Sequence, residues 1–302
     1  MKTQRFGVEI EMTGISRSAA AGVIAKHFHT TKEHRPEMGY DTRRVKDPQG
    51  RWWKVVSDVS ITPQKGGTTL NTGNNRNIYQ VEVVTPILTW GDIETLQQVV
   101  RALRKAGAKV NGSCGIHIHV DAAPHTPTSL RNLINIFASR EDMIYKALDV
   151  KNSRLKHCKK LRTKLVDDVN GKKTVTLDDL AAFWYDGSNP ANARYQHYHD
   201  TRYCGLNLHA VWYKGTVEFR AFNSTLHAGE VKAYIHLALG MSHQALKQRA
   251  AKPAKPDTDN EKYTFRCWLL RLGFIGPEFE STREHLTKNL SGNGAWRHGR
   301  PA

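Results

Sequence analysis

Several stretches of the chain alternate apolar and polar residues, which is the pattern of a β-strand with one face in the core. In the opening segment QRFGVEIEM, Phe6, Val8 and Ile10 share one face. Glu9 and Glu11 share the other face. The same pattern predicts further strands in RWWKVVSDVSI, in YQVEVVTPIL, at residues 114–121, and twice in YCGLNLHAVWYKGTVEFRAF, where Lys214-Gly215 is expected to join the two.

Other stretches repeat apolar residues at helical spacing. Ser16 is a candidate N-cap of the first helix, and Gly107 a C-terminal stop of the second. Residues 29–51 are polar and basic, so we expect a loop there, while Asn170-Gly171 predicts a turn and GGTTLNTGNNRN a flexible connection. The predicted helices cover residues 16–28, 92–106, 128–148, 178–185, 230–248, 263–272 and 278–290.

Together these elements predict an α+β fold. The one segment typical of a linker is AAKPAKPDTDN, which is rich in Pro, Lys and Asp. We therefore expect a main domain over residues 1–250 with a basic insertion at about 151–200, a linker at 251–261, and a helical C-terminal extension at 262–302.

The composition is typical of a folded soluble protein, and the absence of an export signal predicts a cytoplasmic location. Hydrophobic residues make up 39% and charged residues 24% of the 302 positions, which excludes wholesale disorder. No apolar run approaches the roughly 20 residues of a membrane helix, and the opening MKTQRFGVEIEM lacks the apolar core of a signal peptide. Without an export signal, we expect free thiols at the four widely spaced cysteines, which are Cys114, Cys158, Cys204 and Cys267.

The chain is strongly basic, with 45 lysines and arginines against 28 acids and a net charge of +17. This excess favours an anionic partner, although a solvated basic surface explains it equally well. A nucleic-acid-binding module is one hypothesis, because KNSRLKHCKKLRTK supplies cations and WYDGSNPANARYQHYH supplies rings for stacking. A solvated surface insertion is the alternative explanation of the first segment.

Carboxylates, imidazoles and a guanidinium occupy the polar faces of four predicted strands. His117 and His119 are two residues apart in GIHIHV. Glu218 and Arg220 have the same spacing in TVEFRAF, and Glu82 lies among apolar residues in YQVEVVTP. A sheet with one wet face could produce any single pair. All four strands together indicate a site, because an ordinary wet face mixes Lys, Thr, Ser and Gln with its acids.

The clustered glutamates call for cations between them. Two carboxylates ~4 Å apart repel by roughly 4 kcal/mol at an effective dielectric of 20. Hard divalent ions such as Mg²⁺ or Mn²⁺ prefer oxygen ligands, and an imidazole can complete one such set. The lack of cysteine ligands argues against structural zinc.

The sequence carries none of the common nucleotide-binding or hydrolytic motifs: no P-loop, no HExxH, no dinucleotide fingerprint and no nucleophile elbow. Any ATP must therefore be held by metals and arginines on a sheet. The HxH strand also fits a metal-dependent hydrolase, which would need no ATP. In such hydrolases HxH usually closes the first strand, whereas here ExE takes that place.

Six motifs follow one another along the chain: FGVEIEM, SDVSI, VEVVTPIL, CGIHIHV, RYCGLNL and TVEFRAFNSTL. In this order they resemble the amidoligase family, which belongs to the carboxylate-amine ligase superfamily together with glutamine synthetase and glutamate-cysteine ligase. The resemblance covers roughly residues 5–245. The segment FRCWLLRLGFIGPEFESTREHLTKNL also resembles an extension of phage and prophage members.

The resemblance implies a glutamine-synthetase-like antiparallel half-barrel sheet, with helices outside and ATP and two or three Mg²⁺ (or Mn²⁺) on its concave face. His119 would be a second candidate, after His117, for contact with metal or phosphate, and Glu218 would link metal to nucleotide phosphate. Arg220, with Arg202 as a second candidate, would orient the substrate carboxylate or the γ-phosphoryl group. The implied metal ligands are Glu9, Glu11, Glu82, His117 and Glu218.

The implied reaction joins a carboxylate to an amine. ATP phosphorylates the carboxylate, the amine attacks the acyl phosphate, and phosphate leaves as the amide forms. Asp58 matches an aspartate of a DGS-like motif that would bind or deprotonate the amine, although Val59 replaces the glycine. The two substrates stay open and include amino acids, peptides and anionic polymers. Nucleic acid is a further possible partner, and no membrane is expected.

Overall fold

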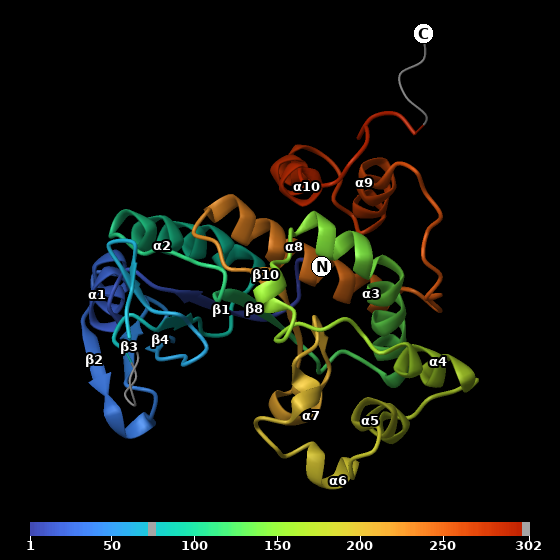
Figure 1. Ribbon diagram of the computed structural model, residues 1–302, viewed down its shortest axis with the longest axis horizontal. Helices are drawn as coiled ribbons and strands as arrows, with labels where there is room; N and C mark the ends of the chain where they lie inside the picture. Colours follow the sequence, from blue (N-terminus) through green and yellow to red (C-terminus); the bar gives the residue numbers. More distant parts are fainter. Residues whose placement is uncertain (72–76, 298–302) are drawn as a thin grey trace.

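The computed structural model describes residues 1–71 and 77–297 (Figure 1). This part of the chain forms a mixed fold around an open eight-stranded sheet whose neighbouring strands pair antiparallel, in agreement with the α+β prediction. In spatial order the strands are β2 (Lys32–Arg35), β3 (Thr42–Lys46), β4 (Trp52–Val56), β7 (Val81–Val84), β1 (Phe6–Met12), β8 (Gly115–Asp121), β10 (Thr216–Asn223) and β9 (Leu206–Asn207).

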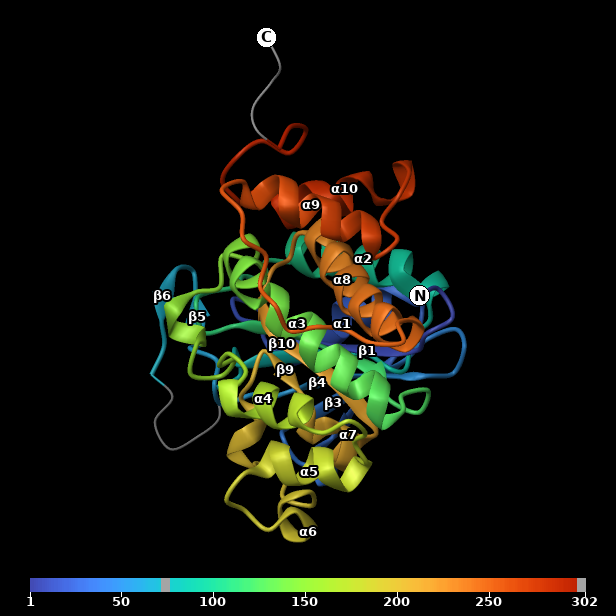
Figure 2. The ribbon, with the colours of Figure 1, turned by 90° about the vertical axis from the view of Figure 1, so that its right-hand side faces the viewer.

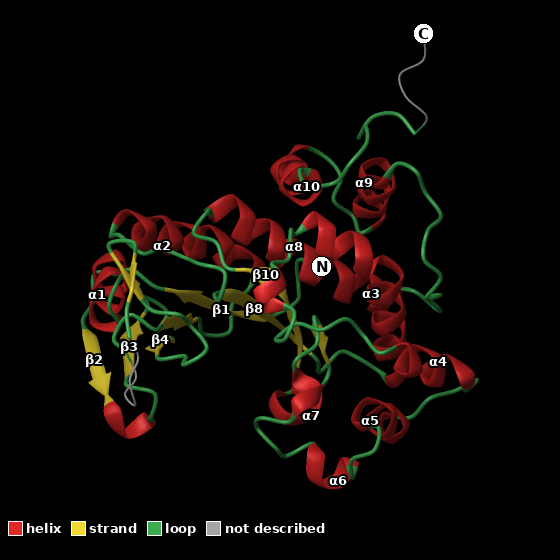
Figure 3. Cartoon of the chain, in the orientation of Figure 1, coloured by secondary structure: helices red, strands yellow, loops and turns green. Residues whose placement is uncertain are grey.

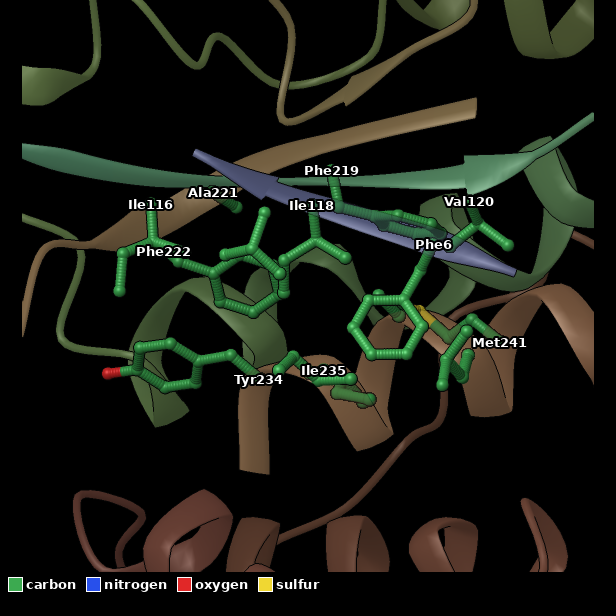
Figure 4. Close-up of a cluster of buried hydrophobic side chains, with 14 of the residues drawn as sticks. Phe6, Ile116, Ile118, Val120, Phe219, Ala221, Phe222, Tyr234, Ile235 and Met241 are labelled. Atoms are coloured by element: carbon green, nitrogen blue, oxygen red, sulfur yellow. The ribbon is translucent and has the colours of Figure 1, made fainter. Parts of the chain in front are cut away.

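Alternation along the central strands sends apolar side chains to one face of the sheet. Phe6 of β1, Ile118 of β8 and Phe219 of β10 are almost fully buried on this face. Figure 4 shows them packed with Ile235 and Met241 of the helix α8 (Ala228–Lys247), which crosses beneath them. This layer of the core ties the middle of the sheet to its longest covering helices.

Four helices cover the apolar face of the sheet. They lie in a row above the strands in Figure 1, and Figure 3 shows the same separation of helix from strand. The Ser16 hydroxyl accepts a hydrogen bond from Ala19 N at 3.2 Å, so the predicted N-cap of the first helix is confirmed. The helices are α1 (Arg17–His27), α2 (Ile93–Lys105), α3 (Pro127–Ala147) and α8.

Shorter elements lie on the side of the sheet away from these helices (Figure 1). Most come from the region predicted as a basic insertion, and they lie over the β8–β10–β9 half of the sheet. A two-stranded hairpin precedes residues 72–76, so the predicted connection GGTTLNTGNNRN falls partly outside the described residues. The helices on this side are α4 (Thr163–Gly171), α5 (Leu177–Tyr185), α6 (Pro190–Ala193) and α7 (His209–Lys214), whereas the hairpin strands β5 (Gln64–Lys65) and β6 (Thr68–Thr69) lie by the end of β1, where Gly14 N donates to Gln64 O.

The C-terminal helices α9 (Glu261–Arg271) and α10 (Glu280–Thr287) pack on the outer side of α8 (Figure 2). Residues 250–260 reach them without regular structure. The Asn132 side chain accepts a hydrogen bond from Ala251 N at 3.0 Å, which holds the start of this segment against α3. The division of the chain into main domain, linker and extension stays a prediction.

Three local expectations were wrong. Residues 29–51 are not a loop, because β2 and β3 pair there at the edge of the sheet. Asn170-Gly171 is not a hairpin turn but the end of α4. Lys214-Gly215 does not join two strands directly: α7 ends at Lys214, and Gly215 reverses the chain into β10 with a φ of 70°.

The remaining expectations on thiols and membrane spans can also be compared with the structure. All four cysteines are free, and Cys114 and Cys158 are buried. In the described part of the chain, no helix combines the length and the apolar character needed to cross a membrane.

A buried histidine joins α8 to the C-terminal helices. His236 stacks on Trp90 with ring centroids 4.6 Å apart, and its Nδ1 lies 2.8 Å from Thr282 Oγ1 of α10. Its Nε2 has no partner in the described structure. Burial, reinforced by the charges of Lys232 and Lys2, lowers the pKa of His236 to about 3.

We expect this histidine to make the protein sensitive to acid. Between about pH 6.5 and about pH 3, His236 is protonated in the unfolded chain but stays neutral in the folded chain. Its contribution to the free energy of unfolding is therefore fully present above about pH 6.5 and is lost progressively as the pH falls toward about 3. The loss amounts to ~1.4 kcal/mol per pH unit. In His236→Phe this contribution to the slope should disappear. Urea unfolding at several pH values between about 5 and 7.5 measures it, and an unchanged slope in the variant would contradict the assignment.

Candidate metal centre and active site

Strand register brings the predicted site residues together. Glu9 of β1 lies opposite His117 of β8, and Glu11 lies opposite Glu82 of β7. Farther along β8, His119 lies opposite Glu218 of β10. All these positions belong to the face of the sheet opposite the apolar one. The structure therefore gathers the four glutamates and both histidines that the sequence singled out.

His117 lies between two groups of carboxylates. Its Nδ1 is 3.1 Å from Glu9 Oε2 and 3.8 Å from Glu218 Oε1. Its Nε2 is 3.8 Å from Glu11 Oε1. The sets Glu9–His117–Glu218 and Glu11–Glu82–His117 each place one ligand atom per residue within 4.8 Å of the others. A neutral imidazole has one free lone pair, so His117 can ligate an ion on one side while its other nitrogen donates to a carboxylate.

Burial and neighbouring charges set the protonation of these groups. Burial and the charge of Arg220 lower the pKa of His117 to about 4, which keeps its ring neutral near pH 7. Burial and the charge of Asp58 raise the pKa of Glu11 to about 8. Burial and then the charge of Glu9 likewise raise the pKa of Glu82 well above its ordinary value. Glu11 and Glu82 therefore have too little positive charge nearby to offset their burial.

Other carboxylates of the cluster have cationic partners. Burial opposes ionisation of Glu218, but the Arg220 guanidinium, with NH1 2.5 Å from Glu218 Oε1, holds the pKa of that carboxyl far below its ordinary value. The second oxygen of Glu218 accepts a hydrogen bond from Asn207 Nδ2 at 2.6 Å. Lys214 Nζ lies 3.3 Å from Glu9 Oε1. Arg220 therefore pairs with Glu218, its neighbour on the same strand face.

β10 contains an irregularity at Arg220. The pairing of β10 with β8 shifts register between Phe219 and Phe222, which is where Arg220 lies. Its backbone N–H donates to Gly205 O at 2.7 Å. Such bulges redirect single side chains next to sites while the rest of the strand continues. Alternation from Glu218 places Arg220 on the polar face, and the shift returns Phe222 to the apolar face opposite Ile116.

Sequence reasoning missed Arg154, the most buried cation of the site. Only 2% of its surface is exposed, although it comes from the segment interpreted as a solvated basic insertion. Its NH2 donates to Arg220 O at 3.1 Å, and its NH1 is 3.9 Å from Glu11 Oε2. A Cβ on Gly115 would lie 2.0 Å from NH1, so the lack of a side chain there makes room for the guanidinium. Nothing in the local sequence distinguishes Arg154 from its basic neighbours.

The cluster has the donors and the charge that Mg²⁺ or Mn²⁺ require. Its ligand atoms are mostly carboxylate oxygens, which hard divalent ions prefer, with imidazole nitrogen in support. His119 Nε2 is buried without a hydrogen bond and lies 3.3 Å from Glu9 Oε1 and 3.6 Å from Glu218 Oε1. The carboxylate of Glu82 contacts no cation among the described residues. These two groups fit metal ligands better than structural ones.

Two cavities meet at the cluster and share Glu9 and Lys214. The first, of about 410 Å³, contains Asp58, Arg202, Arg220 and Arg154, so the structure brings all the predicted substrate-contacting residues to one cavity. Tyr40 and Tyr198, whose hydroxyl oxygens are 2.7 Å apart, link the β2–β3 connection to the insertion at its edge. The second cavity, of about 450 Å³, adjoins Gly7, Val84, Pro86, Ile87 and His119.

Arg202 differs from the other cations of the first cavity. It lies in a 3₁₀ turn, donates from NH1 to His197 O at 3.0 Å, and has its guanidinium carbon 5.3 Å from the Tyr198 ring centroid. No carboxylate among the described residues pairs with it. Asp58, just after β4, is fixed by a hydrogen bond from Ser60 N at 2.7 Å. Val59, which replaces a glycine of the motif, is thereby accommodated in a turn.

An antiparallel sheet with carboxylates and imidazoles on one face is the layout that the six motifs predicted for an amidoligase. Residues 2–242 match the model of a family described as "putative amidoligase enzyme", and the chain belongs to this family. Membership indicates an enzyme, and among enzymes a ligase. A search of curated proteins gave no match. The family model ends before the C-terminal helices, so the resemblance of that segment to phage members stays a prediction.

We expect the purified protein to bind Mn²⁺ through this cluster. Glu11→Gln should weaken binding by about tenfold or more, because an amide cannot replace the charge of a carboxylate ligand. Titration followed by the electron paramagnetic resonance of free Mn²⁺ measures the affinity. Glu141→Gln is the matched control, since Glu141 is a buried carboxylate on α3 that accepts a hydrogen bond from Leu161 N. Equal affinities in the two variants would remove the cluster as the metal centre.

Proposed function

We propose that the protein is an ATP-dependent ligase that joins a carboxylate to an amine through an acyl phosphate, with Mg²⁺ or Mn²⁺ bound by the four glutamates and two histidines. The main support is the carboxylate–imidazole cluster at the junction of two cavities, in a chain of the amidoligase family. The proposal includes a relation of the open antiparallel sheet to the half-barrel of glutamine synthetase. It also places the reaction in the cytoplasm.

The chemistry of the two cavities suggests how the substrates divide between them. The second cavity has apolar walls, including Ile87 with 62% of its surface exposed, and Gly7 leaves its floor without a side chain. A flat nucleotide base suits such a surface. The first cavity is lined by several cations and acids and suits charged substrates. ATP would then place its phosphates beside Lys214 and Glu9, where the cavities join.

The protein's own residues would act on charge and position. Arg220, held by Glu218, lies where it can orient the γ-phosphoryl group or the carboxylate as negative charge spreads during transfer. Its planar guanidinium suits either group better than lysine does. Arg202, which contacts no carboxylate in the described structure, would hold the carboxylate substrate from the other side of the cavity. Asp58 would bind the amine and accept its proton.

Bound divalent ions would supply positive charge to the phosphate oxygens during transfer. Glu9 and His119 line the second cavity, and Glu218 lies 3.6 Å from His119; these three would hold the ion that accompanies the nucleotide. Glu11 and Glu82 lie deeper in the first cavity. His117 would ligate the ion at one of these two sites and donate a hydrogen bond to a carboxylate of the other site.

The contacts of the basic insertion bear on the nucleic-acid alternative. Lys160 pairs with Asp142, Arg162 with Asp186, and Lys164 with Asp168. These pairs, together with the buried Arg154, reduce the charge that the segment could offer to a phosphate backbone. They favour the interpretation of this segment as part of the folded enzyme. A hydrolase using the HxH strand remains the competing activity, and it differs by needing no ATP.

Glu218→Gln should abolish ATP turnover while leaving the fold intact. The amide is similar in size, but it removes a metal ligand and the partner of Arg220. The measurement is ADP release with Mg²⁺ or Mn²⁺ across pools of amino acids, peptides and polyamines. Turnover that requires both a carboxylate and an amine, and that persists in Glu141→Gln, supports ligation. Hydrolysis of an amide without any nucleotide would instead favour the hydrolase.

Asp58→Asn should separate the two halves of the reaction. If Asp58 serves the amine, the variant still forms the acyl phosphate but transfers it slowly to the natural amine. Hydroxylamine, a strong nucleophile that is neutral near pH 7, should then rescue product formation as the hydroxamate. The expected fall in amide formation is about 10²–10⁴-fold, the usual contribution of a general base. Equal loss with both nucleophiles would place Asp58 in the phosphorylation step instead.

A further inference from the structure

A second group of metal-binding side chains lies on the opposite side of the molecule from the active-site cavities. His227 and Glu230 come from the start of α8, and His285 comes from α10. One ligand atom from each residue lies within 4.8 Å of the other two. Among the described residues, this is the only such group that is separate from the active-site cluster.

Local packing turns the two imidazoles toward one gap. Their ring centroids are 4.9 Å apart at an angle of 65°. A Cβ on Gly229 would lie 2.6 Å from His285 Nε2 and 3.3 Å from His227 Nδ1, so both nitrogens face the space above this glycine. A side chain at position 229 would fill that space. The Gly229 backbone thus forms one wall of a small cradle for the two ring nitrogens.

The carboxylate of the group is held in place and already attracts a cation. Thr225 Oγ1 donates to Glu230 Oε2 at 2.6 Å, which fixes the orientation of the carboxylate. The ammonium of Lys288 contacts the other oxygen. Hydrogen-bonded carboxylates of this kind are usual around metal sites, where outer contacts orient the ligands. An ion would compete with the Lys288 ammonium for Glu230 and would replace the 3.3 Å hydrogen bond from Glu230 N to His227 Nδ1.

We propose that His227, Glu230 and His285 form a binding site for a late first-row divalent ion, Zn²⁺ in the first place, which fastens α10 to α8. Two imidazoles and one carboxylate are a donor set that suits Zn²⁺, whereas the oxygen-rich active site suits Mg²⁺. His227 is exposed, so a water molecule can take the fourth position. This site goes beyond the proposed ligase activity and does not depend on it.

At this location the ion would have a structural role. The chain between α8 and α9 runs through residues 250–260 without regular structure, and α10 returns to pack on α8. An ion held by both helices closes this long loop at its far end. An ion that binds only the folded state stabilises it by an amount that rises with the logarithm of the ion concentration. We therefore expect Zn²⁺ to slow the opening of the C-terminal helices without changing the sheet.

The test compares zinc binding in the full-length protein and in single variants. After exposure to Zn²⁺ and gel filtration, the wild type should retain one more zinc ion per chain than His285→Ala or His227→Ala. Zinc should slow hydrogen exchange of the α10 amides by about tenfold in the wild type and not in these variants. His29→Asn is the control: it removes an exposed histidine, and asparagine tolerates its φ of 54°.

A further variant changes the affinity in the opposite direction. Lys288→Ala removes the ammonium that competes for Glu230, so it should bind Zn²⁺ about tenfold more tightly than the wild type. This variant is informative even if a histidine variant fails to fold, as judged by circular dichroism. Equal zinc content in wild type and His285→Ala would overturn the proposal. Unchanged or weaker zinc affinity in Lys288→Ala would also overturn it.

Discussion

The crowding of carboxylates on one face of the sheet is the constraint to which the rest of the site responds. Cross-strand register places Glu11 directly opposite Glu82, while Glu9 faces His117. Like charges within about 5 Å repel by roughly 3 kcal/mol at an effective dielectric of 20. Three cations offset this repulsion: Arg220 pairs with Glu218, Lys214 pairs with Glu9, and Arg154 lies near Glu11. These cations come from the later half of the chain, so the insertion and β10 must be folded for the early strands to tolerate their charge.

The same register fixes the hydrophobic core. A slip of β1 by one residue would turn Glu9 and Glu11 into the core and expose Phe6 and Ile10. Both outcomes are costly, because an unpaired buried charge loses its hydration and a large apolar side chain loses its packing. The two faces of β1 therefore enforce one pairing. The register that packs the core in Figure 4 therefore also fixes which side chains meet on the polar face.

Much of this arrangement could be predicted from the sequence, because strand alternation has a period of two and is unaffected by distant contacts. The polar faces of β1, β7, β8 and β10 were found in this way. The cations that contact the glutamates could not be found in this way. Arg154 becomes buried only because Gly115 leaves space for its guanidinium. Lys214 was interpreted as a turn residue, since its proximity to Glu9 depends on α7. The edge strand β2 and its neighbour β3 were missed because their sequences, KEHR and TRRVK, are mostly polar and lack the apolar alternation of the central strands.

The contrast between a basic protein and an acidic site has a physical rationale. The chain carries a net charge of +17, yet its central cluster gathers four carboxylates, of which Glu82 contacts no cation among the described residues. A positive exterior attracts anions such as nucleotides and carboxylates and raises their rate of encounter. A site lined only with cations would bind nucleotides and carboxylates alike and would not hold each in the position that phosphoryl transfer needs. Under the proposed function, glutamates at the junction of the cavities would reserve that position for a metal–phosphate complex, while Arg202, which pairs with no carboxylate among the described residues, would receive the carboxylate substrate. The opposed charges would then separate the nucleotide from the group that it phosphorylates.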